Sequence, residues 1–160
     1  MLTTALTLAV MVMIFCFSMQ NADRSDQTSG RISQAVIPVF YPEYETSQPS
    51  VKQMIYNTVQ HAVRKCAHFT EYALLGFMLR LCLESWIGRL TEKKHVLLIL
   101  ALLIGALYAG TDELHQLLID GRSGQWTDVL LDSCGVLTGA LIGTLLVRLS
   151  EKRRGKNAKE

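Results

Sequence analysis

Two pairs of ionisable side chains in this chain have a spacing that suits metal binding. His68 and Glu71 are three residues apart, and so are Asp112 and His115. Residues at this spacing share one face of a helix, so two facing helices would bring two imidazoles and two carboxylates together. Such a set can hold a divalent cation. A divalent metal at His68, Glu71, Asp112 and His115 is therefore an alternative, although not the favoured one, because a histidine near a helix end often bonds only a neighbouring carboxylate.

The same side chains could transfer protons. A histidine flanked by carboxylates can act as a general acid or base, and Asp128 and Asp132, four residues apart, could share a proton. Arg64, Lys65 and Arg122 would then hold an anion, such as the phosphate or pyrophosphate group of a lipid carrier. The catalytic candidates are His68, Glu71, Asp112, His115 and Asp128. No nucleophile stands out, so whether the protein is an enzyme stays open.

Recognition without a reaction is another interpretation. A basic rim over a polar pocket at the level of the lipid headgroups would suit an anionic lipid or a lipid-linked envelope precursor. Tyr72 and Trp126 would serve as interface anchors or stacking partners.

A purely structural role stays open as well. Ion pairs between neighbouring helices can hold their packing register without adding much stability. The pairs would be Arg122 with Asp128, Arg64 with Glu71, and His68 with Asp112. The ionisable groups outnumber what such pairing requires, and polar groups inside membrane helices are expected to have a function.

The apolar residues that surround these groups occur in blocks. The chain has 160 residues, of which 49% are hydrophobic and only 19% charged, which predicts one domain embedded in a membrane. Four segments approach the roughly 20 residues that a spanning helix needs. They are residues 2–20, 67–87, 96–116 and 127–149. The nearly balanced charge gives no reason to expect nucleic acid as a partner.

The distribution of Lys and Arg predicts the orientation of these spans. Basic residues are dense around the connection after the second span, where Arg80, Arg89, Lys93 and Lys94 occur, and in the tail at 150–160, so both regions are expected in the cytoplasm. The segment 21–65 and the connection that contains Arg122 are then extracytoplasmic, and both termini are cytoplasmic. The first span lacks the basic leader of a secretory signal and is expected to be retained.

Between the first two spans, residues 21–49 are rich in Ser, Gln, Asp and Pro and show no periodicity, which indicates a surface excursion. Residues 50–66 have apolar side chains at helical spacing and predict an amphipathic helix along the outer membrane interface. The sequence therefore predicts an all-α fold: an integral membrane four-helix bundle with an extra extracytoplasmic amphipathic helix. Four cysteines without metal-like spacing are expected to be small residues of the helices, with a Cys16–Cys66 pair left open.

The fourth span carries Gly135, Gly139 and Gly143 on the same stripe as Asp128 and Asp132. Glycines at this spacing permit close contact between helices in membranes, within one chain or between two. The two carboxylates therefore look into the bundle and not into lipid. The corresponding stripe of the third span holds Asp112, His115 and Gln116, while Glu113 is turned away by about 100°.

Three separated motifs resemble the VanZ-like family of bacterial integral membrane proteins: FSMQ (17–20), RKCAHFTEYALLGF (64–77) and DELHQLLIDGRSGQWTDVLLDSCGVLTGALIG (112–143). The founding member of that family is associated with resistance to teicoplanin, and no settled reaction comes with the family. The resemblance implies a multi-pass protein of the bacterial cytoplasmic membrane with a role in the envelope. The resemblance also implies a set of site residues. They are Lys65, His68, Glu71, Tyr72, Asp112, Glu113, His115, Gln116, Arg122, Ser123, Asp128 and Asp132.

Taken together, these patterns predict a polar pocket on the extracytoplasmic side that binds an anionic lipid or a lipid-linked cell-wall precursor. Such binding would affect glycopeptide susceptibility. The alternative is a membrane-embedded enzyme, acid/base or metal-assisted, that acts on a lipid phosphate or a lipid-linked substrate. The predicted binding residues are Arg64 and the twelve site residues that the resemblance implies.

Overall fold

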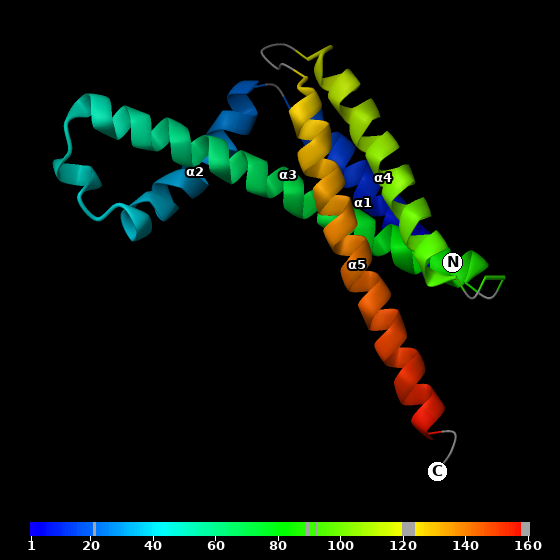
Figure 1. Ribbon diagram of the computed structural model, residues 1–160. Helices are drawn as coiled ribbons and strands as arrows, with labels where there is room; N and C mark the ends of the chain where they lie inside the picture. Colours follow the sequence, from blue (N-terminus) through cyan, green and yellow to red (C-terminus); the bar gives the residue numbers. More distant parts are fainter. Residues whose placement is uncertain (21, 89, 92, 120–123, 158–160) are drawn as a thin grey trace.

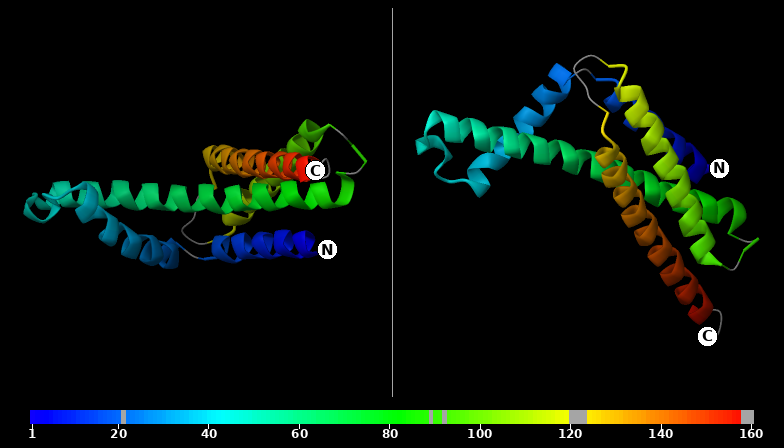
Figure 2. Two further views of the ribbon diagram at one scale, coloured as in Figure 1. Left: turned by 90° about the horizontal axis from the view of Figure 1, so that it is seen from below. Right: turned by 45° about the horizontal axis from the view of Figure 1, so that its top comes forward.

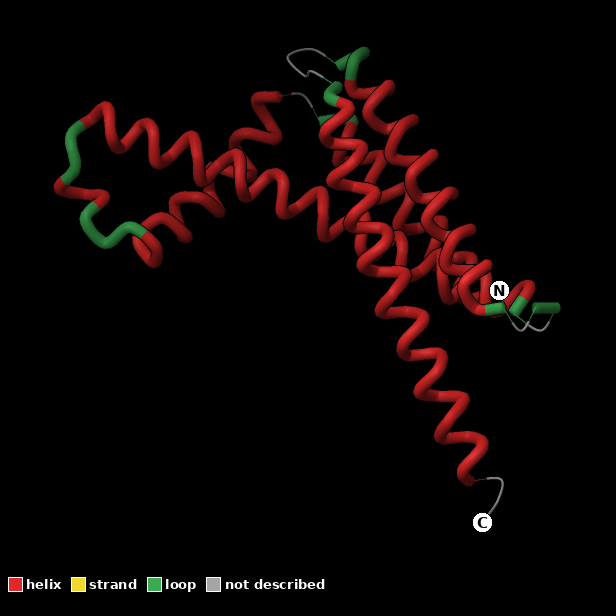
Figure 3. The backbone as a smooth tube through the Cα atoms, in the orientation of Figure 1, coloured by secondary structure: helices red, strands yellow, loops and turns green. Residues whose placement is uncertain are grey.

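A computed structural model describes residues 1–160 except 21, 89, 92, 120–123 and 158–160. The described part folds into α1 (Leu2–Ser18), α2 (Ala22–Phe40), the short 3-10 helix η1 (Tyr44–Thr46), α3 (Pro49–Ile87), α4 (Lys94–Gln116) and α5 (Trp126–Asn157). Helices joined by short loops make up this part of the chain, and it contains no strand (Figure 3). The prediction of an all-α fold is confirmed.

Two of these helices are long and apolar enough to cross a membrane, judged by length and composition within the described residues. They are α4 and the segment Trp126–Arg154 of α5. Helix α1 is equally apolar in character but has only 17 residues and ends at Ser18, two residues before the expected end of the span. The helices of the predicted four-helix membrane bundle are therefore present, but their arrangement across a membrane stays a prediction.

Helix α3 joins two elements that the sequence analysis had kept apart. The amphipathic stretch and the second expected span form one helix of 39 residues. Pro49 starts it at the first turn, where a missing N–H costs nothing, and no other proline and no glycine occurs before Gly76. Because nothing interrupts the helix near residue 66, the amphipathic part continues straight out of the packed helices.

Residues 22–40 are helical, so the prediction of a non-periodic surface excursion is wrong for this stretch. Helix α2 packs on the N-terminal half of α3 and the two form a hairpin that extends away from the other helices (Figure 1). Its buried stripe contains Ser29, Ser33 and Ile37 at intervals of four. The two hydroxyls donate to backbone carbonyls one turn earlier, which satisfies them inside the contact. Small polar residues thus share the buried side of this helix with Ile37, and its polar and apolar side chains lie on opposite sides.

The remaining helices pack around the C-terminal half of α3. Seen from below, α3 lies between α1 and α5, and α4 lies alongside α5 (Figure 2). The contact between α3 and α5 depends on glycine. A Cβ on Gly139 would lie 1.7 Å from the Ala73 carbonyl oxygen, and one on Gly135 would lie 2.5 Å from the Phe69 carbonyl oxygen. The sequence leaves open whether the glycine stripe packs within one chain or between two chains. In this structure it packs within one chain, against α3.

Candidate functional site

Polar side chains from four helices meet at one end of this packed core, which we call the site end. It consists of the last turn of α1, the middle of α3, the last turns of α4 and the first turns of α5. Helices α1 and α4 run toward this end, and α3 and α5 run away from it, as the contacts Ser18–Asp112 and Lys65–Asp128 show. The predicted convergence of the second, third and fourth stretches is thus present, and α1 contributes to it as well.

Asp112 of α4 is buried at the site end with only 3% of its surface exposed. Its Oδ2 accepts hydrogen bonds from Ser18 Oγ (2.7 Å) and Gln116 Nε2 (3.2 Å). Its Oδ1 is buried and accepts no well-formed hydrogen bond within the described part of the chain, although the Tyr72 side chain lies beside the carboxylate. Both donors are neutral, so no basic side chain described here offsets the charge of this carboxylate.

Asp128 at the start of α5 pairs with Lys65 of α3 through a hydrogen-bonded ion contact. Both side chains are largely buried, which strengthens the interaction relative to a surface pair. The expected partner, Arg122, lies outside the described residues, as does Ser123, so neither can be placed in the site.

Asp132 lies one turn deeper in α5 and is fully buried. His68 Nδ1 lies 4.0 Å from Asp132 Oδ2, and neither oxygen of this carboxylate accepts a hydrogen bond from the described residues. The carboxylates of Glu71, Asp112, Glu113 and Asp128 lie close enough to act on Asp132 electrostatically. His68 therefore faces Asp132, and not Asp112 as one of the predicted ion pairs required.

Glu113 is also buried, although the helical spacing turned it away from Asp112. The connection between α4 and α5 is short, so the start of α5 covers this side of α4. The backbone N–H of Gln125 donates to Glu113 Oε2 at 2.9 Å. Helical spacing describes which face of α4 carries Glu113. It does not reveal that the segment just before α5 covers that face.

Aromatic rings form the wall of the site between α1, α3 and α4. Tyr72 is fully buried beside Asp112 and Asp132, and its ring lies 6.3 Å from that of Tyr108. The His115 ring stacks on Phe15 of α1 with centroids 4.9 Å apart. Both predicted site residues, Tyr72 and His115, are thus held by ring contacts.

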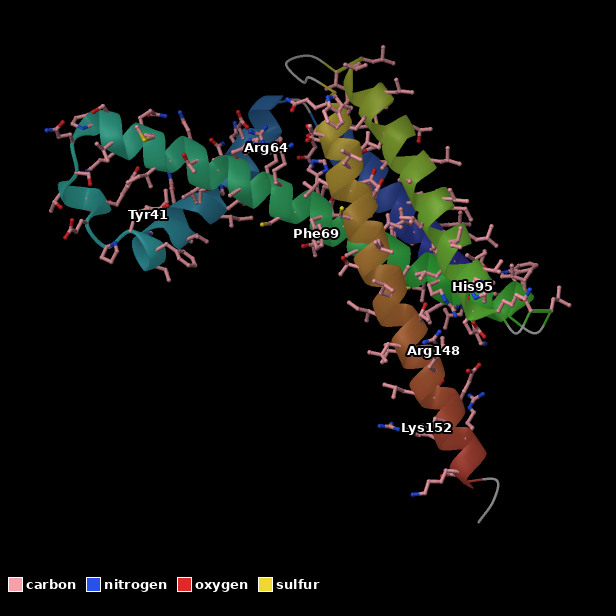
Figure 4. All side chains as sticks on the ribbon, viewed as in Figure 1. Tyr41, Arg64, Phe69, His95, Arg148 and Lys152 are labelled. Carbon is pink, nitrogen blue, oxygen red and sulfur yellow. The ribbon has the colours of Figure 1, made fainter. Side chains whose placement is uncertain are left out.

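Arg64 leaves this cluster and points to the hairpin. Its Nη1 lies 3.2 Å from Asp26 Oδ1 of α2, and Figure 4 shows Arg64 at the crossing of α2 and α3. The predicted Arg64–Glu71 pair is not the salt bridge that forms. Arg64 instead ties α2 to α3 within the hairpin.

A cavity of about 160 Å³ opens where α1, α2 and α3 meet. Its polar lining is provided by Arg64, His68 and Glu71 with hydroxyls that include Ser18 and Ser29. Its apolar lining includes Phe17, Ile32, Val63 and Ala67. The cavity thus offers a charged and hydroxylated side next to an apolar one.

The four candidate metal ligands are divided between two places. His68 and Glu71 line the cavity under α2, whereas Asp112 and His115 line a second cavity between α1 and α4. Among the described residues, no group of three or more His, Cys, Asp or Glu side chains is arranged to hold a metal ion. The four cysteines are free, so Cys16 and Cys66 do not pair.

A second charged network, which was not predicted from the sequence, lies at the opposite end of the core. Arg80 of α3 is fully buried and donates from Nε to Thr144 Oγ1 (2.9 Å) and from Nη1 to Glu84 Oε2 (2.8 Å). Lys94 of α4 bridges Glu84 (2.5 Å) and Glu151 of α5 (2.8 Å). Arg80 and Lys94 had served only as indicators of a cytoplasmic connection. The spacing of Arg80 and Glu84, four residues apart on one helix, is the signal that could have revealed this pair, whereas no local spacing indicates the contact of Lys94 from the next helix.

A comparison with protein-family models finds a match to VanZ/LLP1 over residues 3–147. This range contains α1 from its second residue, α2 to α4, the site end and most of the α5 segment that is apolar enough to span a membrane. No curated protein and no solved structure gives a significant match.

Proposed function

The chain belongs to the VanZ/LLP1 family, and from this premise we propose that it binds the polar head of an envelope lipid in the cavity under α2. Membership makes it an envelope-related membrane protein. The ligand would be an anionic lipid or a lipid-linked cell-wall precursor, and a change in the availability of that lipid would alter glycopeptide susceptibility.

The observation that carries this proposal is the composition of the 160 Å³ cavity. A lipid head needs charged or hydrogen-bonding partners, and the first segment of its chain needs apolar ones. Arg64, His68 and the serine hydroxyls offer the former, and Phe17, Ile32 and Val63 offer the latter. Arg64 is the cation best placed for a phosphate, because it lines the cavity and its pair with Asp26 is more exposed than the Lys65–Asp128 pair.

The arrangement of the helices supports a location of this cavity at the outer surface of the bacterial cytoplasmic membrane. We place α1, the C-terminal half of α3, α4 and α5 across the bilayer as a four-helix bundle, with the α2–α3 hairpin outside. Both termini are then cytoplasmic. The projecting end of α5, where Figure 4 labels Arg148 and Lys152, would lie at the inner surface, where basic residues are favoured.

Native mass spectrometry of gently extracted protein tests the binding. Ala67 is exposed at its position and lines the cavity, so Ala67→Leu should fill it without disturbing the helix contacts. Thr70→Leu, on the same helix but not part of the cavity lining, is the matched control. We expect the wild-type protein and Thr70→Leu to retain a phospholipid or prenyl phosphate and Ala67→Leu to lose it. Equal retention in all three proteins would refute the assignment of this cavity.

A second candidate function is catalysis, and the His68–Asp132 contact favours it. A buried carboxylate opposite a histidine that lines a cavity is the arrangement of a general base with its orienting group. The reaction would be acid/base chemistry on a lipid phosphate or lipid-linked substrate. His68→Ala should then abolish turnover of the retained lipid while its binding persists. Loss of binding alone would favour recognition over catalysis.

A further inference from the structure

The second cavity, between α1 and α4, has a lining unlike that of the first. Its volume is about 340 Å³, and it is lined by Phe15, Tyr108, Thr111, Asp112 and His115. Three of these five side chains are aromatic rings, one is a carboxylate, and no basic residue other than His115 borders it. Phe15 and Thr111 are exposed, so the cavity can be reached from the surface of the protein.

The aromatic rings are held in place. The Tyr108 hydroxyl donates to the Met11 carbonyl oxygen of α1 at 2.7 Å, which fixes its ring between α1 and α4. The stack of His115 on Phe15 orders the other wall. Aromatic rings present a negative face, and several rings around one space attract organic cations such as ammonium groups.

Asp112 provides an independent indication of a cation. It is 3% exposed, its Oδ1 accepts no well-formed hydrogen bond from the described residues, and the groups that bond to the carboxylate or lie beside it, Ser18, Gln116 and Tyr72, are neutral. A buried carboxylate without a cationic partner carries a large desolvation cost. A positively charged ligand in the cavity would offset that cost.

We propose that the cavity formed by Phe15, Tyr108, Thr111, Asp112 and His115 binds an alkylammonium group. Its charge lies against Asp112 and its methyl or methylene groups lie against the aromatic rings. The ammonium belongs to a lipid headgroup or to a soluble amine. The inference does not depend on the cavity under α2, because Asp112 and the rings do not line that cavity.

The test uses choline and its neutral isostere 3,3-dimethyl-1-butanol. The full-length protein is placed in nanodiscs of phosphatidylglycerol, which has no ammonium group, and binding is measured by saturation-transfer NMR at constant ionic strength. We expect saturable binding of choline and none of the isostere. Asp112→Asn should weaken choline binding about 10-fold or more, the effect of losing one charged contact. Phe15→Leu should weaken it several-fold.

Glu151→Gln is the charge-matched control, since it removes one carboxylate at the opposite end of the core, and it should bind choline as the wild-type protein does. Melting curves verify that each variant is folded, and Phe15→Leu serves if Asp112→Asn does not fold. Equal binding of choline and the isostere would overturn the proposal, as would full affinity in both cavity variants.

Nanodiscs of phosphatidylcholine distinguish the source of the ammonium group. If the cavity holds a lipid headgroup, phosphatidylcholine suppresses the binding of free choline; if it holds a soluble amine, the binding of free choline does not change. Failure of Ala67→Leu to release lipid would leave these outcomes unaffected.

Discussion

Gly139 of α5 lies so close to Ala73 of α3 that an added Cβ would come within 1.7 Å of the Ala73 carbonyl oxygen. The two backbones are therefore in direct contact at this point. This contact fixes the register of α3 against α5, and the register in turn sets Lys65 opposite Asp128 and His68 opposite Asp132. The site end depends on a glycine that lies two turns away from it.

Gly139→Ala should separate α3 from α5 and lower the stability of the protein by about 1–3 kcal/mol, the usual effect of overpacking. Thermal unfolding in detergent measures the change. Gly110→Ala is the matched control, because a Cβ at Gly110 meets nothing within 4 Å. It should be neutral or slightly stabilising, since alanine favours the helix. A comparable loss in both variants would show that the contact is not specific.

The Lys65–Asp128 pair predicts coupling between its two members. Lys65→Met leaves Asp128 largely buried without its cation, and Asp128→Asn leaves the ammonium without its acceptor. Each single change should cost about 1–2 kcal/mol, and the double change should cost less than the sum of the two. A double-mutant cycle of unfolding free energies measures this. Strict additivity would mean that the two side chains act independently.

Glu84 is the centre of the network at the opposite end, because it accepts hydrogen bonds from both Arg80 and Lys94. Glu84→Gln should therefore destabilise the protein more than Glu151→Gln, since it leaves the fully buried Arg80 with Thr144 as its described hydrogen-bond partner. The difference in melting temperature between the two variants checks the prediction. A larger loss in Glu151→Gln would contradict it.

The proposed orientation predicts opposite accessibility for two engineered cysteines. Ser47→Cys lies at the end of the hairpin, and Lys152→Cys lies on the projecting part of α5. In a protein whose four native cysteines are replaced by serine, an impermeant maleimide added to intact cells should label position 47 only. Permeabilised cells should allow labelling at both positions. Labelling of position 152 in intact cells would reverse the topology.

Much of the helical architecture and of the site follows from the sequence. The apolar blocks predicted the helices, and the spacing of Gly135 to Gly143 predicted the close contact of α5. Helical periodicity also placed Asp112 and Asp132 on inward faces, where both are buried. These features depend on residues within one element, which local spacing can describe.

The rest depends on contacts between elements that are distant in the sequence. Helix α2 was missed because Ser, Gln, Asp and Pro are frequent in its sequence, although its polar and apolar side chains lie on opposite sides of the helix. Ser18 closes an apolar helix and gave no indication that it donates to Asp112, 94 residues away. Arg80 was counted only among the basic residues around a connection, although it is fully buried and donates hydrogen bonds to Thr144 and Glu84.

Photo-crosslinking with a diazirine-bearing phospholipid tests most directly whether the cavity under α2 holds a lipid. Adducts at the cavity residues Phe17, Ile32 and Val63 should saturate as the probe concentration rises and should disappear in Ala67→Leu. Adducts at exposed apolar residues of α5 such as Leu145 should rise without saturation and should not respond to this substitution. Adducts confined to the apolar residues of α5, with none on the cavity lining, would contradict the proposed lipid site.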